Sequence, residues 1–220
     1  MTTTLAVFST DALRYVLPHV SKEESRPILN GAYFEPSGIA CATSGHTLCM
    51  YKGAVTGLTR PIILRIEKPA SVTARKVDHI TAEIPDAPDY SAHILLTLRS
   101  AYGQVLAVAV AYEVEGPFPN FRQVLPTGDP SDLARIALDP AKLNRFSVAD
   151  QQAITLDFYG EHKAVGVRYP NNACAYGLIM PIRTMDQTTP SATWPWQSET
   201  WGPAPTPADH AERYAVAVTA

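Results

Sequence analysis

Apolar residues recur at helical spacing near the start of the chain and at strand spacing soon afterwards. Ser9, a residue type that caps helices, precedes an apolar stripe formed by Leu13, Val16, Leu17 and Val20. Pro18 and the polar run 21–24 end this pattern. Turn-type sequences then separate three runs with strand character, at residues 28–34, 38–43 and 47–52. The pattern predicts one amphipathic helix followed by a three-stranded meander.

The same order of elements returns twice, each time with a strand ahead of the helix. In the second pass a helix opens at Lys68-Pro69 and runs to about Val77, and the strands lie at 61–66, 80–84, 94–98 and 104–112. In the third pass Asp139-Pro140 opens a helix through Phe146, and the strands lie at 133–138, 153–158, 164–169 and 174–180. Three helix-plus-strands units predict an α+β fold with antiparallel sheets outside and the helices on one face.

Composition and charge exclude several classes of protein. The 220 residues are 46% hydrophobic, and 18 Lys+Arg oppose 21 Asp+Glu, so net charge neither requires nor forbids nucleic acid. Cys41, Cys49 and Cys174 form no paired motif, which favours a reduced, cytoplasmic setting without disulfides. The N-terminus lacks a signal-peptide pattern, and no apolar stretch is long enough to span a membrane.

Residue patterns of catalysis are missing from the sequence. It contains no nucleophile elbow, phosphate-binding loop or dinucleotide fingerprint, and its histidines lack metal-ligand spacing. We therefore predict a binding protein without enzymatic activity, metal or cofactor.

Two distant segments, 118–126 and 176–183, share an unusual combination of residues. Each joins prolines, which fix the backbone, to apolar residues and one arginine, Arg122 or Arg183. Such surfaces suit an extended, mostly apolar peptide. We interpret the two segments as the walls of one peptide-binding groove.

Together with segments 26–31 and 43–48, these two segments resemble the bacterial DNA sliding clamp, the beta subunit of the replicative DNA polymerase. The resemblance runs from about residue 5 to residue 183 and matches the family's middle domain and half of its last domain. It implies a DNA-clamp-like fold, with a domain at 1–126, a half domain at 127–183 and a Pro/Trp-rich tail at 184–220. The tail holds Trp194, Trp196 and Trp201; an extended, unpacked chain is one interpretation, and docking onto the groove or a neighbouring subunit is another.

The resemblance also implies a set of residues that line the peptide groove: Leu29, Thr43, Gly45, His46, Leu48, Pro119, Arg122, Val124, Ile179, Met180, Pro181, Ile182 and Arg183. Three positions depart from the family pattern, since Ser44, Thr47 and Gln123 stand where the family has charged residues. We expect this groove either to prefer more apolar ligands or to bind the usual clamp-binding peptide more weakly.

Non-specific contact with duplex DNA is expected from basic residues on and near the helices, which line the inner face of clamp rings. These residues are Arg14, Lys22, Arg26, Lys68, Arg75, Lys76, Lys142 and Arg145. An ordinary solvated face is the alternative interpretation of the same charges.

The leading hypothesis is a shortened processivity factor that associates with DNA and binds DNA polymerase, clamp-loader or other clamp-binding-motif proteins. Family rings contain six domains, so about four copies of this chain would close a ring, and a homo-oligomer is expected. One alternative is a non-ring adaptor or decoy that binds partner peptides without encircling DNA. Another is an interaction module whose own tryptophan-bearing tail occupies the groove.

Overall fold

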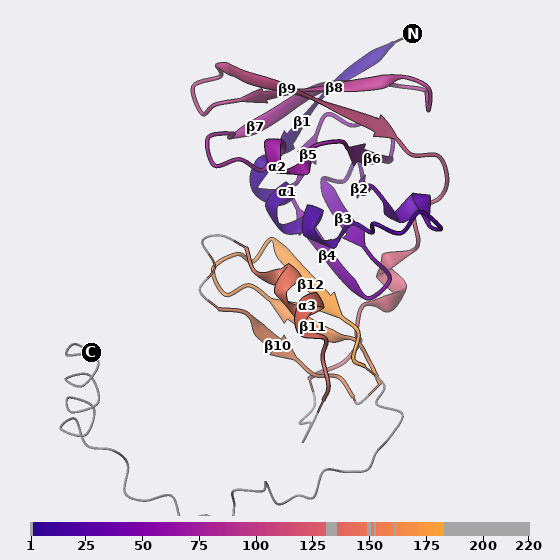
Figure 1. The fold of residues 1–220 in the computed structure, drawn as a ribbon, viewed down its shortest axis with the longest axis vertical. Helices are drawn as coiled ribbons and strands as arrows, with labels where there is room; N and C mark the ends of the chain where they lie inside the picture. The colour runs from indigo at the N-terminus through magenta and orange to yellow at the C-terminus, as the bar shows by residue number, and fades with distance from the viewer. Residues whose placement is uncertain (1, 131–135, 149–150, 152, 161, 183–220) are drawn as a thin grey trace, which may run out of the picture. The chain divides into compact units, whose positions relative to one another are not determined.

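One antiparallel sheet of twelve strands runs through the part of the protein that the structure describes. The computed structural model describes residues 2–130, 136–148, 151, 153–160 and 162–182, which belong to one compact unit. The strand order is β10-β11-β12-β4-β3-β2-β6-β9-β8-β7-β1-β5. Figure 1 shows the sheet from β7, β8 and β9 at one end, through β2, β3 and β4, to β10, β11 and β12 at the other. The α+β, clamp-like architecture expected from the sequence is confirmed.

The first repeat begins with a strand that the sequence pattern did not reveal. Its elements are β1 (Thr3–Ser9), α1 (Thr10–Val16), two 3₁₀ turns (Leu17–His19 and Pro27–Leu29), β2 (Ala32–Phe34), β3 (Ile39–Thr43), β4 (Thr47–Lys52) and β5 (Val55–Thr56). Ser9 caps α1 as expected, since its hydroxyl accepts the Ala12 N–H at 3.3 Å. The predicted strand 28–34 is too long, because Pro27 opens a 3₁₀ turn there.

The second repeat has the predicted strands and a shorter helix. Its elements are β6 (Ile62–Ile66), α2 (Pro69–Val72), β7 (His79–Pro85), β8 (His93–Arg99) and β9 (Val105–Glu113). The helix expected to reach Val77 ends at Val72. Arg14 of α1 donates to the carbonyls of Thr73 and Ala74, each at 3.2 Å, so its guanidinium holds the following backbone in a non-helical path.

The third repeat follows the prediction from its helix onwards. It contains α3 (Pro140–Leu143), a 3₁₀ turn (Asn144–Phe146), β10 (Thr155–Asp157), β11 (Val165–Arg168) and β12 (Ala175–Ile179). Asp139 caps α3 by accepting the Ala141 N–H at 2.9 Å. Residues 136–138 are not a strand, which corrects the predicted strand 133–138 where it is described; its first part lies outside the described residues.

The main core lies between the helices and one face of the sheet. Leu13 and Val16 of α1 pack there with Phe8, Phe34 and other buried residues. Phe146 of the third repeat belongs to the same core and lies 4.5 Å, centroid to centroid, from the buried His19 ring. The third repeat is therefore packed onto the first by both a sheet and a core. No helix in the described ranges is long and apolar enough to cross a membrane.

Candidate peptide-binding surface

Pairing of β12 with β4 joins two of the four sequence segments that suggested a groove. Leu178 lies opposite Leu48, and Ile179 lies opposite Thr47. The Met180 N–H donates to the His46 carbonyl at 2.9 Å, so the chain leaves the sheet beside the turn between β3 and β4. A hydrogen-bonded ladder thus fixes where Met180 emerges.

A small apolar cluster lies on the face of the sheet opposite the main core. It places the third segment, 118–126, beside β4 and β12. This outer cluster contains Cys41, Leu48, Phe121, Ala164 and Leu178. Phe121 is 4% exposed and begins a 3₁₀ turn, Phe121–Val124, which the Asn120 side chain caps. The turn therefore stands on the sheet with Phe121 as its anchor and Val124 outside.

Aromatic stacking fixes the approach to this turn. The rings of Phe118 and Tyr33 stack with centroids 4.8 Å apart and planes 5° from parallel. Tyr33 and Phe118 were not among the predicted site residues, although Phe118 stands next to Pro119 in the sequence. Their stacking holds the backbone that leads into Pro119.

The turn between β3 and β4 is built by hydrogen bonds from small polar residues. The Thr43 hydroxyl donates to the Thr47 carbonyl at 2.9 Å and accepts the Gly45 N–H at 3.0 Å. Ser44 and Thr47, both buried, join hydroxyls at 3.1 Å. Gly45 has φ 84°, a backbone conformation that favours glycine. Ser44 and Thr47, which stand where the family has charged residues, thus stabilise the turn by a hydrogen bond to each other.

Seven predicted groove residues are exposed. Val124, Met180 and Ile182 leave 52%, 42% and 47% of their surface open, which is high for large apolar side chains. The others are Gly45, His46, Pro119 and Arg122, and Thr43 and Pro181 are half-buried. Exposed apolar side chains beside prolines are what a peptide-binding surface requires.

Three predicted groove residues have a different position from the one expected. Ile179 is completely buried in the main core, because alternate residues of β12 face opposite sides of the sheet, so it does not line the surface. Leu29 and Leu48 are 6% and 5% exposed, and Leu48 supports the surface from behind as part of the outer cluster. Arg183 lies outside the described residues.

Arg122 is already paired. Its two terminal nitrogens donate to the two carboxylate oxygens of Glu35 at 2.8 and 2.7 Å, and its guanidinium lies 4.5 Å from the centroid of the Phe121 ring. These hydrogen bonds lower the pKa of Glu35. Burial, followed by Glu35, raises the pKa of the neighbouring Tyr33. A ligand carboxylate would have to compete with Glu35 for Arg122.

The predicted DNA-facing residues fall into two groups. Lys22, Arg26, Lys68, Arg75 and Lys76 are exposed, and Arg26 also lies against Gly45. Arg14 donates to carbonyls after α2, Arg145 has a buried nitrogen near His19, and Lys142 pairs with Asp139 at 3.5 Å. Arg14 and Arg145 thus make contacts within the fold, and that they face DNA stays a prediction; Arg26 lies beside the turn between β3 and β4.

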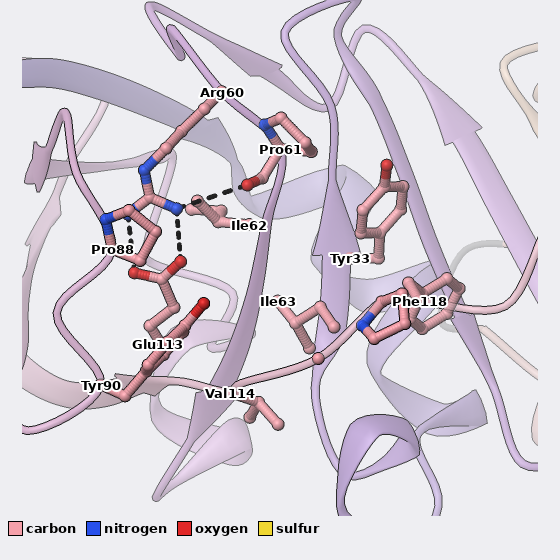
Figure 2. A pocket seen from close by; sticks show the side chains of 12 residues that line it. Tyr33, Arg60, Pro61, Ile62, Ile63, Pro88, Tyr90, Glu113, Val114 and Phe118 are labelled. Carbon is pink, nitrogen blue, oxygen red and sulfur yellow. Dashed lines mark hydrogen bonds and ion pairs between the residues drawn. The ribbon is translucent and has the colours of Figure 1, made fainter.

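Two hollows of about 390 Å³ each are lined by residues other than the predicted site residues. The first contains an ion pair between Arg60 and Glu113, with Tyr90 and Phe118 among its walls, as Figure 2 shows. The second lies along α3, beside Leu143 and Ile154. The first hollow is formed by residues far apart in the chain, and the second by residues within 140–154; neither matched a motif in the sequence. Among the described residues, no group of three or more His, Cys, Asp or Glu side chains is placed to hold a metal ion.

Comparison with known proteins gives a match in structure alone. No family model matches the chain, and no curated protein does. The Bartonella birtlesii sliding clamp (DNA polymerase III subunit beta), solved with bound griselimycin, has 17% identity and a TM-score of 0.61, over 82% of this chain and 66% of that one. The Thermotoga maritima beta subunit has 11% identity and a TM-score of 0.58, over 84% of this chain and 66% of that one. The Pseudomonas aeruginosa clamp has 15% identity and a TM-score of 0.59, over 84% of this chain and 68% of that one.

These similarities cover most of this chain and about two thirds of each clamp. They agree with the shortened arrangement that the four sequence segments suggested. At these identities the likeness concerns the fold. The chain has the fold of the bacterial DNA sliding clamps, the beta subunits of DNA polymerase III, in shortened form.

Proposed function

We propose that this protein is a clamp-like processivity factor without catalytic activity. It associates non-specifically with duplex DNA and tethers polymerase or another replication protein through a short peptide bound on its surface. The observation that carries the proposal is the junction of β12, β4 and the Phe121–Val124 turn. There Met180, Val124 and Ile182 are exposed together with Pro119 and His46.

The surface has the chemistry of a tolerant peptide site. Methionine adapts to ligands of different shape, and prolines hold the backbone without losing entropy on binding. Apolar area contributes roughly 25 cal/mol per Å² removed from water, so a few such side chains suffice for weak, reversible binding. Griselimycin bound to a clamp of this fold supports the presence of a ligand surface.

DNA association is proposed to rest on the exposed cations Lys22, Lys68, Arg75 and Lys76. Three of these residues lie at the ends of α2 or in the segment after it. Contacts between lysine or arginine and phosphate release counterions, so binding weakens steeply with salt and shows no sequence preference. A tether needs no more specificity than this.

Self-association is proposed to use the two ends of the sheet. β10 ends the strand order at one side, and β5 ends it at the other, where it pairs only Val7 and Phe8 of β1. The rest of β1 presents backbone groups that another copy could pair. A homo-oligomer that encloses DNA would follow if the two ends pair head to tail and the ring closes.

A co-elution experiment tests tethering directly. The protein is incubated with nicked circular plasmid and a fluorescent clamp-binding peptide, and the mixture is passed through a column that excludes only DNA. We expect the peptide to elute with the plasmid only when protein is present, and linearising the plasmid to release both. Met180→Ala should remove peptide from the plasmid fraction and leave the protein there.

Two outcomes would contradict parts of this proposal. A protein that binds the peptide but never elutes with DNA would be the adaptor or decoy rather than a processivity factor. A stable monomer by light scattering, retained equally on circular and linear DNA, would exclude the ring.

A further inference from the structure

Strand β9 has one edge that is paired only near the end of the strand. β6 pairs with β9 from Ala111 onwards, and the Glu67 N–H adds a bond to the Val110 carbonyl at 3.1 Å. Pro69 then begins α2, so the chain leaves the sheet. In Figure 1 the arrowhead of β9 lies beside β6, and the start of the strand extends past it. On this side of β9, no strand in the described part of the chain pairs with residues 105–109.

The hydrogen bond from Glu67 shows which backbone groups face this open edge. In an antiparallel strand the N–H and C=O of one residue point to the same edge, and those of the next residue point to the other. Because the Val110 carbonyl points towards β6, the N–H and C=O of Val108 point to the same side, beyond the last residue of β6. Val108 therefore offers one donor and one acceptor to a strand from outside.

Apolar side chains beside the open edge are exposed. Val105 and Val108 of β9 are 57% and 56% exposed, and Leu95 of β8 is 58% exposed. Leu95 lies opposite Val110, two positions from Val108, so Leu95 and Val108 are on the same face of the sheet, away from the main core. Residues 104–112 contain neither a charged side chain nor a proline. The edge therefore lacks the residues that usually prevent the addition of another strand.

β4 shows how the corresponding edge is covered in the first repeat. β4 is the third strand after α1, as β9 is the third strand after α2. The edge of β4 that faces away from β3 pairs with β12 over five residues of each strand. A strand of another repeat thus closes that edge within the chain. Residues 105–109 form an edge of the same length without such a neighbour among the described strands.

We propose that residues 105–109 pair with the same segment of a second copy of this chain. Two identical antiparallel segments can meet about a two-fold axis, so that each copy donates and accepts the same hydrogen bonds. An uncharged edge meets its copy without like-charge repulsion. The side chains of Val105, Val108 and Leu95 lose exposed apolar surface in this contact.

A second copy fits this edge better than a free peptide does. The segment in the copy is already held extended by its pairing with β8, so it loses less conformational entropy on binding than a flexible peptide would. The contact lies in the middle of the strand order and uses neither end of the sheet. It does not depend on the proposed function.

Sedimentation velocity of the 220-residue protein over a concentration series tests the contact. We expect a concentration-dependent dimer. Val108→Pro removes an N–H that faces the open edge rather than β8, so it should raise the dissociation constant of the dimer at least about tenfold and leave the chain folded. Val108→Thr keeps the N–H and the branched shape, and it should change the dissociation constant by less than about threefold.

A second variant covers the possibility that proline disturbs the strand. Val108→Lys places a charge on each copy at the contact, and it should weaken the dimer by a similar factor. Circular dichroism of each variant checks that it is folded. A parent that stays monomeric at about 1 mM would overturn the proposal. Association that is equally strong in Val108→Pro and Val108→Lys would place the contact at another surface and would also overturn it.

Hydrogen exchange locates the contact within the dimer. We expect the backbone N–H of Val108 to exchange at least about tenfold more slowly at concentrations where the dimer forms than in the monomer. Exchange at Val108 that is unchanged by concentration would contradict the pairing. Protection that appears in the monomer only when a partner peptide is added would assign the edge to that peptide and overturn the second copy as its occupant.

Discussion

Leu178 on β12 lies directly opposite Leu48 on β4, and both side chains share the outer cluster with Phe121. This pair joins the first and third repeats on the face of the sheet away from the main core. The position of the peptide-binding surface therefore depends on a strand pairing between segments about 130 residues apart. Changes that loosen the pair should loosen the surface.

Phe121 and Val124 stand on one 3₁₀ turn and should behave oppositely when truncated. Phe121→Ala removes a ring that is 4% exposed, so the free energy of unfolding should fall by about 3–5 kcal/mol. Val124→Ala removes a side chain that is 52% exposed, so the free energy of unfolding should change by less than about 0.5 kcal/mol, while the affinity for the peptide should fall. Urea unfolding and a peptide titration measure the two effects. Equal stability of the two variants would contradict the anchoring role of Phe121.

Gly177 is required where β12 crosses Phe146. A Cβ at position 177 would lie 2.9 Å from Phe146 Cδ1, and Phe146 is fully buried. Gly177→Ala should therefore destabilise the fold by about 1–3 kcal/mol through overpacking. The denaturation midpoint measures this. The compensating variant Gly177→Ala with Phe146→Leu should recover part of the loss, and a failure to recover any would show that the strain lies elsewhere.

His19 should make the protein sensitive to mild acid. Burial, and secondarily Arg145, lowers the pKa of His19 from 6.5 to about 3, and neither ring nitrogen has a hydrogen-bond partner among the described residues. The unfolded chain thus binds a proton below pH 6.5 that the folded chain refuses until about pH 3. Stability contributed by neutral His19 is full above pH 6.5 and falls as pH drops through this window.

The expected loss is roughly 2 kcal/mol between pH 7 and pH 5, measured as the change in unfolding free energy. His19→Gln cannot take up the proton and should flatten this dependence. His162→Gln, at an exposed position, should leave it unchanged. A parent protein with the same stability at both pH values would contradict the buried, neutral assignment.

Glu35 should restrain the affinity of the surface for acidic peptides. Glu35→Gln removes the charge that pairs with Arg122, whose side chain is half exposed, so the guanidinium becomes available to a ligand carboxylate. We expect binding of a peptide with a free carboxylate to tighten about threefold, with less than about 1 kcal/mol lost in stability. Ser37→Ala removes only the hydroxyl that also bonds Glu35, and it should change neither. Unchanged affinity in Glu35→Gln would show that Arg122 does not face the ligand.

Most strands could be predicted from the sequence because their side chains alternate between core and solvent. β7 and β8 show this directly, with Ile80, Ala82 and Ile84 buried on one and Ile94 and Leu96 on the other. β1 was missed because residues 5–8 are all apolar in the sequence, so the alternation of the strand, in which Leu5 is 60% exposed and Ala6 and Phe8 are buried, is hidden. The length of α2 was overestimated because its end is set by Arg14, a tertiary contact that no local pattern contains.

The candidate site was predictable only in outline. Short motifs with prolines and glycine indicated which segments matter, and the alignment of β12 with β4 brings two of them together. Which side chains point outward depends on strand phase, so Ile179 was assigned to the surface although it belongs to the core. The pairing of Arg122 with Glu35 and the hollow over Arg60 arise from distant residues and leave no local signal.

Titration of a fluorescent clamp-binding peptide into the 220-residue protein tests whether the proposed surface binds a partner peptide. We expect saturable binding that Met180→Ala weakens at least about fivefold, equivalent to about 1 kcal/mol, because Met180 is an exposed anchor of the surface. Tyr102→Ala removes a side chain that is 91% exposed on the turn between β8 and β9, and this variant should bind as the parent does. Absence of binding at millimolar peptide, or equal affinity in the parent and Met180→Ala, would contradict the account.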